Sequence, residues 1–441
     1  MFWTSHPVDK ISGIVTAPGD KSCSHRALIF SGLAVGTSKI SGLLEGEDVI
    51  NTGRAMHALG ANVERTGTNQ WTVTGVGGAG LVAPKDSLDF GNSGTGSRLI
   101  MGVVAGYDIS ATFIGDDSLS SRPMARVITP LQQMGATFNA SEGGRLPLTM
   151  TGRTPLEAIN YCPPQASAQV KSCLLLAGLR ADGTTIITEN TMTRDHSERM
   201  LRGFGADVSV QSTGEGAIVK IDGGQALAAQ ETSVPGDPSS AAFLAAAAII
   251  SRQGGVLVEN VMSNPTRDGI FRAAALMGAK IGAEEVGLAA GERLINMSFE
   301  TSALTGCTIP RNLVPSMIDE FPILAVMAAF SDGETIVRDA AELRVKESDR
   351  ISAVVNMLRV NGVNVEEFED GFVIQGCAGP VPGGGHVETH HDHRIAMSAL
   401  IMGTAAQNPV SVDDIAMIST SYPDFFEHMQ ILGANIQQSV R

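Results

Sequence analysis

The sequence has few aromatic and few charged residues. Phe, Trp and Tyr make up 5% of the 441 residues, and Asp, Glu, Lys and Arg make up 17%, compared with roughly 25% charged residues in an average soluble protein. Hydrophobic residues still reach 43%, which excludes a largely disordered chain. The length predicts two or three domains with substantial cores.

Cysteine is scarce and shows no metal-binding spacing. The five cysteines are Cys23, Cys162, Cys173, Cys307 and Cys377, and no C-x-x-C pair occurs. An odd number of cysteines in a long chain predicts free thiols in a reducing cytoplasm. The same pattern argues against a disulfide framework and against a zinc site, so no metal is expected.

Long apolar segments are also absent. The longest run, 241–250, is too short to span a bilayer, and the first ten residues lack the apolar core of a signal peptide. The net charge of −15 argues against a broad basic face for nucleic acid. We therefore expect a cytoplasmic protein with no nucleic acid or membrane partner, although a local cluster of Lys and Arg can still bind small anions.

One pattern does recur six times along the chain. It consists of an apolar helical stretch, a glycine, and then an alternating segment typical of a strand, as in MHALGANVER, LRGFGADVSV and MQILGANIQQ. We predict that each glycine ends a helix in the left-handed conformation. The six positions are Gly60, Gly135, Gly205, Gly278, Gly362 and Gly433.

A second pattern alternates with the first. A polar cluster opens a helix of small apolar residues, which a β-branched strand then follows. Each unit thus reads helix, strand, helix, strand, strand over about 70 residues, which is longer than a small solenoid repeat. Six such α/β units fit two lobes of three, with a crossover near residues 234–236.

The polar clusters that open these helices contain unexpected cations. Ser, Thr, Asn and Asp there can serve as ordinary N-caps. Capping does not account for Lys21, Arg26, Arg98 or Arg394, because cations in a first turn oppose the helix dipole. An anion bound at the helix N-termini would account for them.

Further cations are expected on the second helix of each unit. They are Arg122, Arg194, Arg267 and Arg344. In the segment LRVKESDR we place Lys346 and Arg350 on one helix face, with Glu347 beside them. The alternative is a solvated face with an ordinary i,i+3 pair between Glu347 and Arg350.

Two other motifs carry less information. The order of glycines in GNSGTGSR is neither the Rossmann fingerprint nor a phosphate-binding P-loop, which argues against dinucleotide binding. The run 390–393, His-His-Asp-His, lacks the spaced partners of a metal site.

Six motifs in order carry a resemblance that covers nearly the whole chain. PGDKSCSHRAL, GNSGTGSR, SSRPM, SAQVKSCLLLAGL, LRVKESDR and DHRIAM resemble the 5-enolpyruvylshikimate 3-phosphate synthase (EPSP synthase) family, in its variant with SAQVKS. The related UDP-N-acetylglucosamine enolpyruvyl transferases usually place Asn after the first-motif Lys and a reactive Cys on a mobile loop. Here Ser22 follows Lys21, and Cys23 lies inside the helix opening.

The resemblance implies a two-lobed inside-out α/β barrel built from six βαβαββ repeats, three per lobe. One lobe is expected to comprise residues 20–235, and the other residues 1–19 and 236–441. The active site is expected in the cleft between the lobes, which would close on the substrates.

The reaction implied is transfer of the enolpyruvyl group of phosphoenolpyruvate to the 5-hydroxyl of shikimate 3-phosphate. It releases phosphate by addition and elimination through a tetrahedral ketal, and it belongs to chorismate and aromatic amino acid biosynthesis. No cofactor is required, a monomer is expected, and glyphosate is an inhibitor of the family. The alternatives are a UDP-N-acetylglucosamine enolpyruvyl transferase and a non-catalytic anion-binding scaffold.

The motif matches also imply which residues hold the substrates. Phosphoenolpyruvate would contact Lys21, Asn92, Gly94, Arg122, Gln169, Arg350 and Arg394. Shikimate 3-phosphate would contact Lys21, Ser22, Arg26, Ser167, Ala168, Gln169, Arg194, Asp319 and Lys346. The cleft would be shaped by Asp237, Thr95 and Asn92.

Catalysis would need an acid and a base at two positions. The resemblance implies that Asp319 takes the hydroxyl proton. It also implies that Glu347 acts as acid and later as base at the methylene carbon, with Lys21 assisting. Two positions depart from some relatives. Glu342 stands where they have Asn, and Thr420 stands near a Lys that contacts phosphoenolpyruvate in those relatives.

Overall fold

The computed structural model describes residues 2–439, which divide into two compact units. The first unit comprises Gly19–Pro235 together with Leu288–Glu292. The second unit comprises the residues up to Pro18, Gly236–Gly287, and the residues from Arg293 onward. The first unit begins one residue before the predicted boundary at residue 20, and its segment Leu288–Glu292 was not predicted from the sequence.

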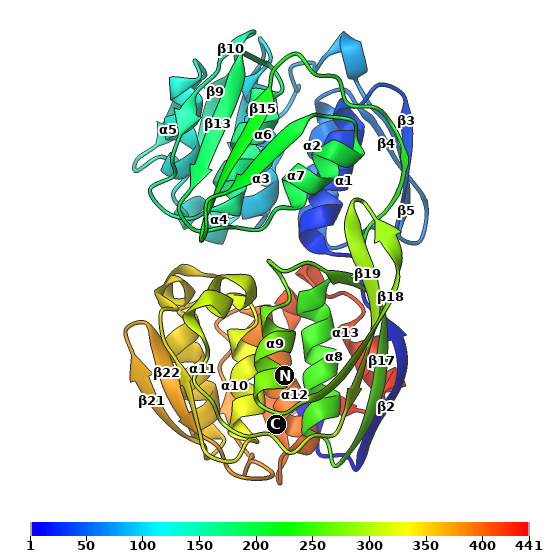
Figure 1. The fold of residues 1–441 in the computed structure, drawn as a ribbon, viewed down its shortest axis with the longest axis vertical. Coiled ribbons are helices and arrows are strands. Elements are labelled where there is room, and N and C mark those ends of the chain that lie inside the picture. Colours follow the sequence, from blue (N-terminus) through cyan, green and yellow to red (C-terminus); the bar gives the residue numbers. More distant parts are fainter. Residues whose placement is uncertain (1, 440–441) are drawn as a thin grey trace. The chain divides into compact units, whose positions relative to one another are not determined.

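The first unit contains three repeats in which a helix, a strand, a further helical segment and two strands follow one another (Figure 1). Repeat one comprises α1 (Lys21–Leu33), β3 (Thr37–Ser41), α2 (Glu47–Ala58), β4 (Asn62–Gly67) and β5 (Gln70–Thr74). Repeat two comprises α3 (Gly94–Ala105), β7 (Ser110–Ile114), α4 (Asp117–Ser121), α5 (Ala125–Gln133), β8 (Thr137–Ser141) and β9 (Arg145–Thr151). Repeat three comprises α6 (Ala168–Gly178), β13 (Thr184–Glu189), α7 (His196–Gly203), β14 (Val208–Ser212) and β15 (Ala217–Asp222).

The second unit contains the other three repeats. Repeat four comprises α8 (Pro238–Ile250), β17 (Gln253–Ser263), α9 (Gly269–Leu276), β18 (Lys280–Ala289) and β19 (Glu292–Glu300). Repeat five comprises α10 (Phe321–Ala329), β20 (Glu334–Val337), a 3-10 turn at Ala341–Val345, α11 (Arg350–Val360), β21 (Asn364–Phe368) and β22 (Gly371–Gln375). Repeat six comprises α12 (His393–Ala405), β24 (Val410–Val412), a 3-10 turn at Ala416–Thr420, α13 (Phe425–Ile431) and β25 (Asn435–Ser439).

The sheets of the repeats share one strand order. In repeat one the third strand, β5, lies between β3 and β4, and a parallel edge strand, β16 (Glu231–Ser233), borders β3. In repeat six the position of the third strand is taken by β1 (Phe2–His6), which pairs antiparallel with both β24 and β25. In repeat four the edge position is taken by β2 (Lys10–Thr16), parallel to β17. The first strands of the chain therefore complete two sheets of the second unit.

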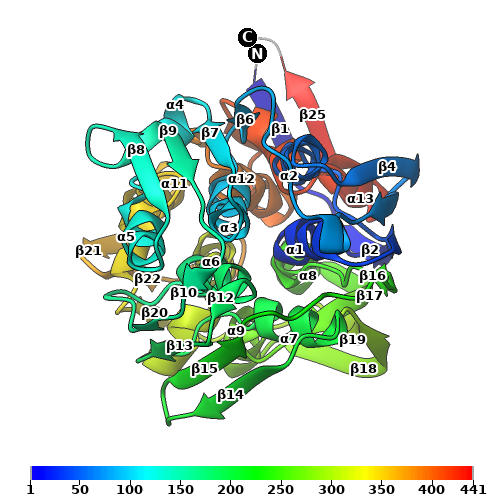
Figure 2. The ribbon, with the colours of Figure 1, turned by 90° about the horizontal axis from the view of Figure 1, so that it is seen from above.

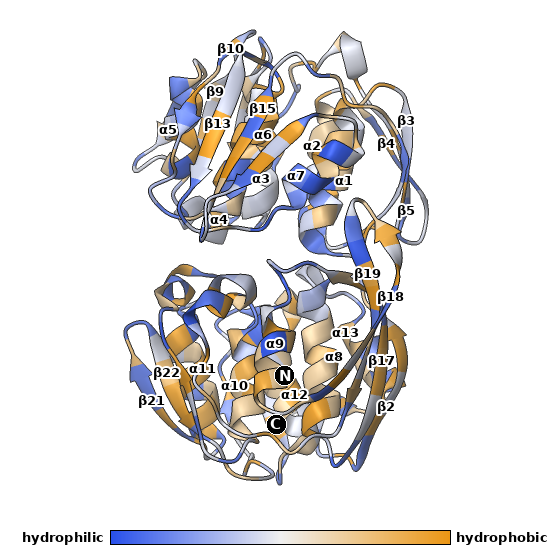
Figure 3. Ribbon diagram, in the orientation of Figure 1, coloured by the Kyte–Doolittle hydropathy of each residue, from blue (hydrophilic) through white to orange (hydrophobic). Residues whose placement is uncertain are grey.

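The first helix of each repeat lies inside its unit. All 13 residues of α8 are buried, and α8, α10 and α12 contact one another. These helices consist mainly of Ala, Leu, Ile and Met on every face, as expected for helices without a solvent side (Figure 3). In the first unit α3 contacts both α1 and α6, and the sheets lie outside them (Figure 2).

The six glycines predicted to end helices all have a positive φ, which confirms the repeat pattern. Their φ angles are 109° at Gly60, 107° at Gly135, 90° at Gly205, 92° at Gly278, 80° at Gly362 and 94° at Gly433. Glycine enters this region without the steric cost of a Cβ. Each helix therefore turns into its strand at a point that the sequence marks.

The cations assigned to second helices lie elsewhere. Arg122 is the C-cap of the short α4, while Arg194 and Arg267 each lie two residues before the helix that follows them. Lys346 is extended, and α11 begins only at Arg350, so these two residues do not share a helix face. That prediction was wrong because Asp349 is the N-cap of α11. Its Oδ1 accepts from Ser352 N at 3.2 Å, so the helix begins at Arg350.

Among residues 2–439, no single helix is long and apolar enough to cross a membrane. The pair Arg311–Met317 and Phe321–Ala329, bent by 119°, meets the criteria of length and composition only when both are counted together.

Candidate active site

The predicted helix openings of the first unit coincide with real helix starts. Asp20 caps α1 by accepting from Cys23 N at 2.7 Å, and Ser93 caps α3 by accepting from Gly96 N at 3.1 Å. Ser167 caps α6 because its Oγ accepts from Val170 N at 3.4 Å, and Ala168 is the first residue of that helix. Helix N-termini attract anions, so these openings are suitable binding positions.

Arginine side chains gather beside Gly94. A Cβ on this residue would lie 3.0 Å from Nη1 of Arg98 and 3.5 Å from Nη1 of Arg122. Burial, together with the positive charges of Arg126 and Arg122, lowers the pKa of Arg98 to about 10. Among residues 2–439, neither Arg98 nor Arg122 forms an ion pair with a carboxylate. A bound anion would relieve this repulsion.

Neutral amides hold these guanidinium groups in place. Arg98 Nη1 donates to Oε1 of Gln169 at 2.6 Å, and Gln169 Nε2 donates to Oγ1 of Thr95 at 3.0 Å. Arg122 Nη2 donates to Oδ1 of Asn92 at 2.8 Å. An amide oxygen orients a guanidinium without cancelling its charge, so the arginines keep their capacity for an anion.

Lys21 is placed differently from the arginines. Its ammonium forms an ion pair with the carboxylate of Asp48 on α2, and 28% of its side chain is exposed. Asp48 was not among the predicted site residues, because nothing in the local sequence pattern links it to Lys21.

Arg26 is buried and well satisfied. Its Nε donates to Ser197 Oγ at 2.8 Å, its Nη1 to Ser22 O at 2.8 Å, and its Nη2 to Ser172 Oγ at 2.7 Å. These bonds use three of the five N–H groups of a guanidinium. Arg194 lies half-buried in the segment that leads from β13 to α7.

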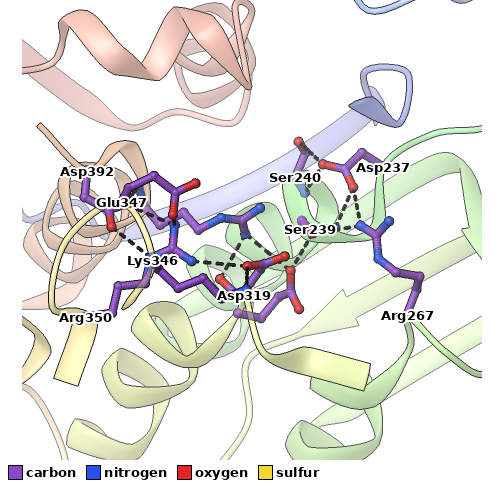
Figure 4. Close-up of polar contacts among 11 residues, drawn as sticks. Asp237, Ser239, Ser240, Arg267, Asp319, Lys346, Glu347, Arg350 and Asp392 are labelled. Atoms are coloured by element: carbon purple, nitrogen blue, oxygen red, sulfur yellow. Dashed lines mark hydrogen bonds and ion pairs between the residues drawn. The ribbon is translucent and has the colours of Figure 1, made fainter. Parts of the chain in front are cut away.

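In the second unit, Arg350 is the centre of a charged cluster (Figure 4). Its side chain is fully buried, and its Nε lies 2.8 Å from Asp392 Oδ2. Its Nη2 lies 2.7 Å from Glu347 Oε2 and its Nη1 lies 3.2 Å from Asp319 Oδ1. Lys346 Nζ lies 3.4 Å from the same Asp319 oxygen. The structure therefore brings together the four residues that the resemblance implied, and it adds Asp392.

The charges of this cluster stabilise one another. Burial opposes the charge of Arg350, but Asp392, Glu347 and Asp319 together raise its pKa. Desolvation likewise opposes the charge of Glu347, whereas Arg350 and His393 hold the pKa of its carboxyl well below the ordinary range. The pKa of Asp392 is lowered despite its burial, chiefly by Arg350. All three groups are therefore charged at neutral pH in this state.

Two further predicted residues lie close to this cluster. Arg394, in the first turn of α12, donates from Nη1 to Asp319 O at 3.0 Å and to Glu320 Oε1 at 3.3 Å. Asp237 caps α8 by accepting from Ser240 N at 3.0 Å, and it lies 2.9 Å from Nη2 of Arg267 (Figure 4). The Arg394 side chain thus holds the start of α10, and the Asp237 side chain holds the start of α8.

The family of the chain follows from comparison with known proteins. The family model for EPSP synthase (3-phosphoshikimate 1-carboxyvinyltransferase) matches residues 5–429. The chain belongs to the EPSP synthase family. A 3-phosphoshikimate 1-carboxyvinyltransferase of Hyphomonas neptunium is 64% identical over 438 residues, covering 99% of this chain and 100% of the relative. The enzyme of the same name from Parvibaculum lavamentivorans is 54% identical over 433 residues, covering 98% and 96%.

Solved structures of the EPSP synthase family share this fold. EPSP synthase from Acinetobacter baumannii superimposes with a TM-score of 0.90 at 41% identity, covering 99% of this chain and 100% of that one. The two-lobed α/β architecture with three repeats in each lobe is therefore confirmed. The matches do not favour the UDP-sugar transferase or the scaffold alternative.

The two positions that depart from some EPSP synthase relatives both have local partners. Glu342 lies 3.1 Å from Lys346 Nζ, so a carboxylate partners that lysine. Thr420 Oγ1 donates to Met417 O at 2.7 Å within its 3-10 turn. It carries no charge that could replace the lysine of those relatives.

One buried group in the described part of the chain has donors of the kind that bind metals. Atoms of Cys23, His196 and Glu292 lie within 4.8 Å of one another. Both oxygens of Glu292 already have partners, at 2.9 Å from His196 Nδ1 and 3.5 Å from Arg199 Nη1. A cation beside the carboxylate disfavours a second cation, so the contacts fit an ion-pair network better than a metal cage.

Proposed function

We propose that this chain transfers the enolpyruvyl group of phosphoenolpyruvate to the 5-hydroxyl of shikimate 3-phosphate and releases phosphate. The observation that carries the proposal is the pair of guanidinium groups of Arg98 and Arg122 beside Gly94, neither of which has a carboxylate partner within the described residues. Each substrate carries a phosphate and a carboxylate, which repel those of the other. At an effective dielectric of about 20, two unit charges 4 Å apart interact by about 4 kcal/mol, so several cations are needed.

Phosphoenolpyruvate is proposed to bind at the α3 N-terminus and the Arg350 cluster. Gly94 leaves the space in front of Arg122 open, and Gln169 lies in the same hydrogen-bonded group. Arginine suits both anionic groups of this substrate because its planar fork can form two parallel hydrogen bonds. Lys21, Asn92, Arg350 and Arg394 complete the proposed set.

Shikimate 3-phosphate is proposed to bind at the N-termini of α1 and α6. Ser22 and Ser167 present short polar side chains there, and Ala168 follows the cap. Arg26 keeps two N–H groups beyond its three bonds to described residues, and Arg194 supplies a cation for the phosphate. Lys21, Gln169 and Lys346 complete the proposed set, with Thr95 and Asp237 shaping the surroundings.

The proposed chemistry is an addition followed by an elimination. Asp319 removes the proton of the 5-hydroxyl as its oxygen attacks the central carbon of the enol, while the methylene carbon gains a proton. The resulting ketal then loses phosphate and one methyl proton. Glu347 serves as acid and then as base at that carbon, and Lys21 assists.

The state of Glu347 is an important part of this mechanism. Arg350 keeps the pKa of the Glu347 carboxyl far below the range of a useful acid at neutral pH. A phosphate or carboxylate that engages Arg350 would compete with Glu347 for the same charge and raise its pKa. Binding of phosphoenolpyruvate would thus prepare the acid that the first step needs.

The proposed function also concerns the roles of the two units, the cellular location and the oligomeric state of the protein. Cations for one pair of substrates are distributed over both units, so both units are proposed to contribute to one catalytic event in a cleft that closes on the substrates. We propose a cytoplasmic monomer, and the cytoplasmic location is supported by the five free cysteines, of which Cys162 and Cys377 are exposed. Exposed thiols persist in a reducing compartment.

The decisive experiment measures phosphate released from phosphoenolpyruvate. The reaction is run with shikimate 3-phosphate, without a second substrate, and with UDP-N-acetylglucosamine. We expect release only with shikimate 3-phosphate. Release only with the UDP-sugar would keep the chemistry and overturn the substrate, and no release from a folded protein with either would overturn the proposal.

A further inference from the structure

Lys171 is a buried lysine that the proposed chemistry does not use. It lies in the first turn of α6, and 1% of its side chain is exposed. Its Nζ lies 2.8 Å from Oε2 of Glu189 and 2.7 Å from Oε1 of Glu198, which are themselves buried. Burying three charged groups requires close pairing, so the cluster specifies one arrangement of the segments that carry it.

This cluster joins three parts of repeat three. Lys171 comes from α6, Glu189 ends β13, and Glu198 lies in the first turn of α7. Lys171 Nζ also donates to the backbone oxygen of Thr193 at 3.5 Å, and Thr193 Oγ1 donates to Glu189 Oε1. The residue before Arg194 is therefore held through both its backbone and its side chain.

The next residue of α6 reinforces the same arrangement. Ser172 Oγ donates to Ala168 O at 2.7 Å and accepts from Ser197 Oγ and from Arg26 Nη2, each at 2.7 Å. The start of α7 is thus connected to the start of α6 and to the Arg26 side chain. Every segment that is proposed to hold shikimate 3-phosphate in the first unit meets this network.

The charge of the lysine is required by its surroundings. With a neutral side chain at position 171, Glu189 and Glu198 would face each other in a buried place without a cation between them. Arg26 and Arg199 also interact with Glu198, whose negative charge opposes the lowering of the pKa that burial causes at each guanidinium, but neither is paired with either of the two carboxylates among the described residues. Repulsion between the two carboxylates would move the 190–195 segment, which connects them.

We infer that Lys171 is a positioning residue for the phosphate of shikimate 3-phosphate: through Glu189, Glu198 and Thr193 it fixes the segment from which Arg194 binds that phosphate. The inference rests on the proposed function. Binding of shikimate 3-phosphate should therefore depend on the cluster of Lys171, Glu189 and Glu198, whereas binding of phosphoenolpyruvate should not.

The test compares KM values for the two substrates in Lys171→Met and in Thr193→Val. Lys171→Met removes the charge, and Thr193→Val removes only the hydroxyl contact with Glu189, so it should fold even if the first variant does not. We expect KM for shikimate 3-phosphate to rise at least about tenfold in Lys171→Met and by a smaller factor in Thr193→Val, with KM for phosphoenolpyruvate changing less than about twofold. Binding of shikimate, which lacks the phosphate, should not change.

The control is Arg153→Gln, which breaks an exposed ion pair with Glu157 in the same unit and should leave both KM values unchanged. An equal rise of both KM values, or an unchanged KM for shikimate 3-phosphate in a folded variant, would overturn the inference. Failure of the proposed function has a different signature, because the wild-type chain would then release no phosphate with shikimate 3-phosphate.

Discussion

Gly94 shows how the absence of a single side chain can define a binding site. Its missing Cβ leaves room next to two guanidinium groups, at 3.0 Å from Arg98 Nη1 and 3.5 Å from Arg122 Nη1. The space is electrostatically unfavourable until an anion enters it. A small substitution at Gly94 should therefore weaken the binding of small anionic ligands.

We expect Gly94→Ala to weaken glyphosate more than phosphoenolpyruvate. A methyl group in this space costs about 1–3 kcal/mol when the neighbours cannot move, which corresponds to an increase of about tenfold or more in the inhibition constant. KM for phosphoenolpyruvate should rise less. Steady-state inhibition measures both, with Gly78→Ala as control, since a Cβ there meets nothing within 4 Å. An unchanged inhibition constant would refute this expectation.

The two carboxylates proposed for proton transfer give a second prediction at this scale. Asp319→Asn and Glu347→Gln should each lower kcat by about 10²–10⁴-fold, the usual contribution of a general acid or base, while both substrates still bind. Rapid-quench kinetics and equilibrium binding measure the two effects. The control is the exposed Glu366→Gln. Rates near wild type in either variant would show that its role is assigned incorrectly.

At the scale of elements, Arg350 connects the start of α11 to the start of α12. The Asp392→Asn variant should lower the free energy of unfolding by about 3–5 kcal/mol, because the fully buried guanidinium then lacks its strongest partner. Urea denaturation measures this loss. As a control, Asp370→Asn weakens an exposed ion pair with Arg338. This variant should lower the free energy of unfolding by about 1 kcal/mol or less.

The same cluster predicts how stability depends on pH. The folded-state pKa values of Glu347 and Asp392 lie below their unfolded values. Their contribution to stability is therefore complete above the unfolded values of about 4 and is lost as the pH falls through the folded values. The difference in unfolding free energy between wild type and Asp392→Asn should shrink below about pH 4. A difference that stays constant from pH 7 to pH 3 would contradict this.

At the scale of the whole molecule, the sequence predicts the repeats well and long-range pairing poorly. The six glycine caps and the helix openings depend on local backbone chemistry, so they can be read directly. The segment before α11 was misplaced, because the helix starts only after its N-cap Asp349 and leaves Lys346 in extended backbone. The Lys21 partner Asp48 and the membership of Leu288–Glu292 were missed because both depend on the folded chain.

The segment Leu288–Glu292 carries a prediction for the molecule as a whole. Glu292 is fully buried in the first unit beside His196 and Arg199, although its strand β19 continues in the second unit. Glu292→Gln should therefore destabilise the first unit by about 2 kcal/mol, the scale of a lost hydrogen bond to a charged group. Hydrogen exchange in α7 measures this, and Glu285→Gln, in an exposed pair of the same hairpin, should not change it.

The position of β1 between β24 and β25 has a consequence for synthesis on the ribosome. Residues 2–16 emerge well before the strands they pair with, because β17, β24 and β25 lie much further along the chain. The first unit, which is almost entirely contiguous, can complete most of its folding while these early strands wait unpaired. The second unit closes only when the end of repeat six has been released. The early strands must therefore be kept from associating with other nascent chains until β17, β24 and β25 have been synthesised.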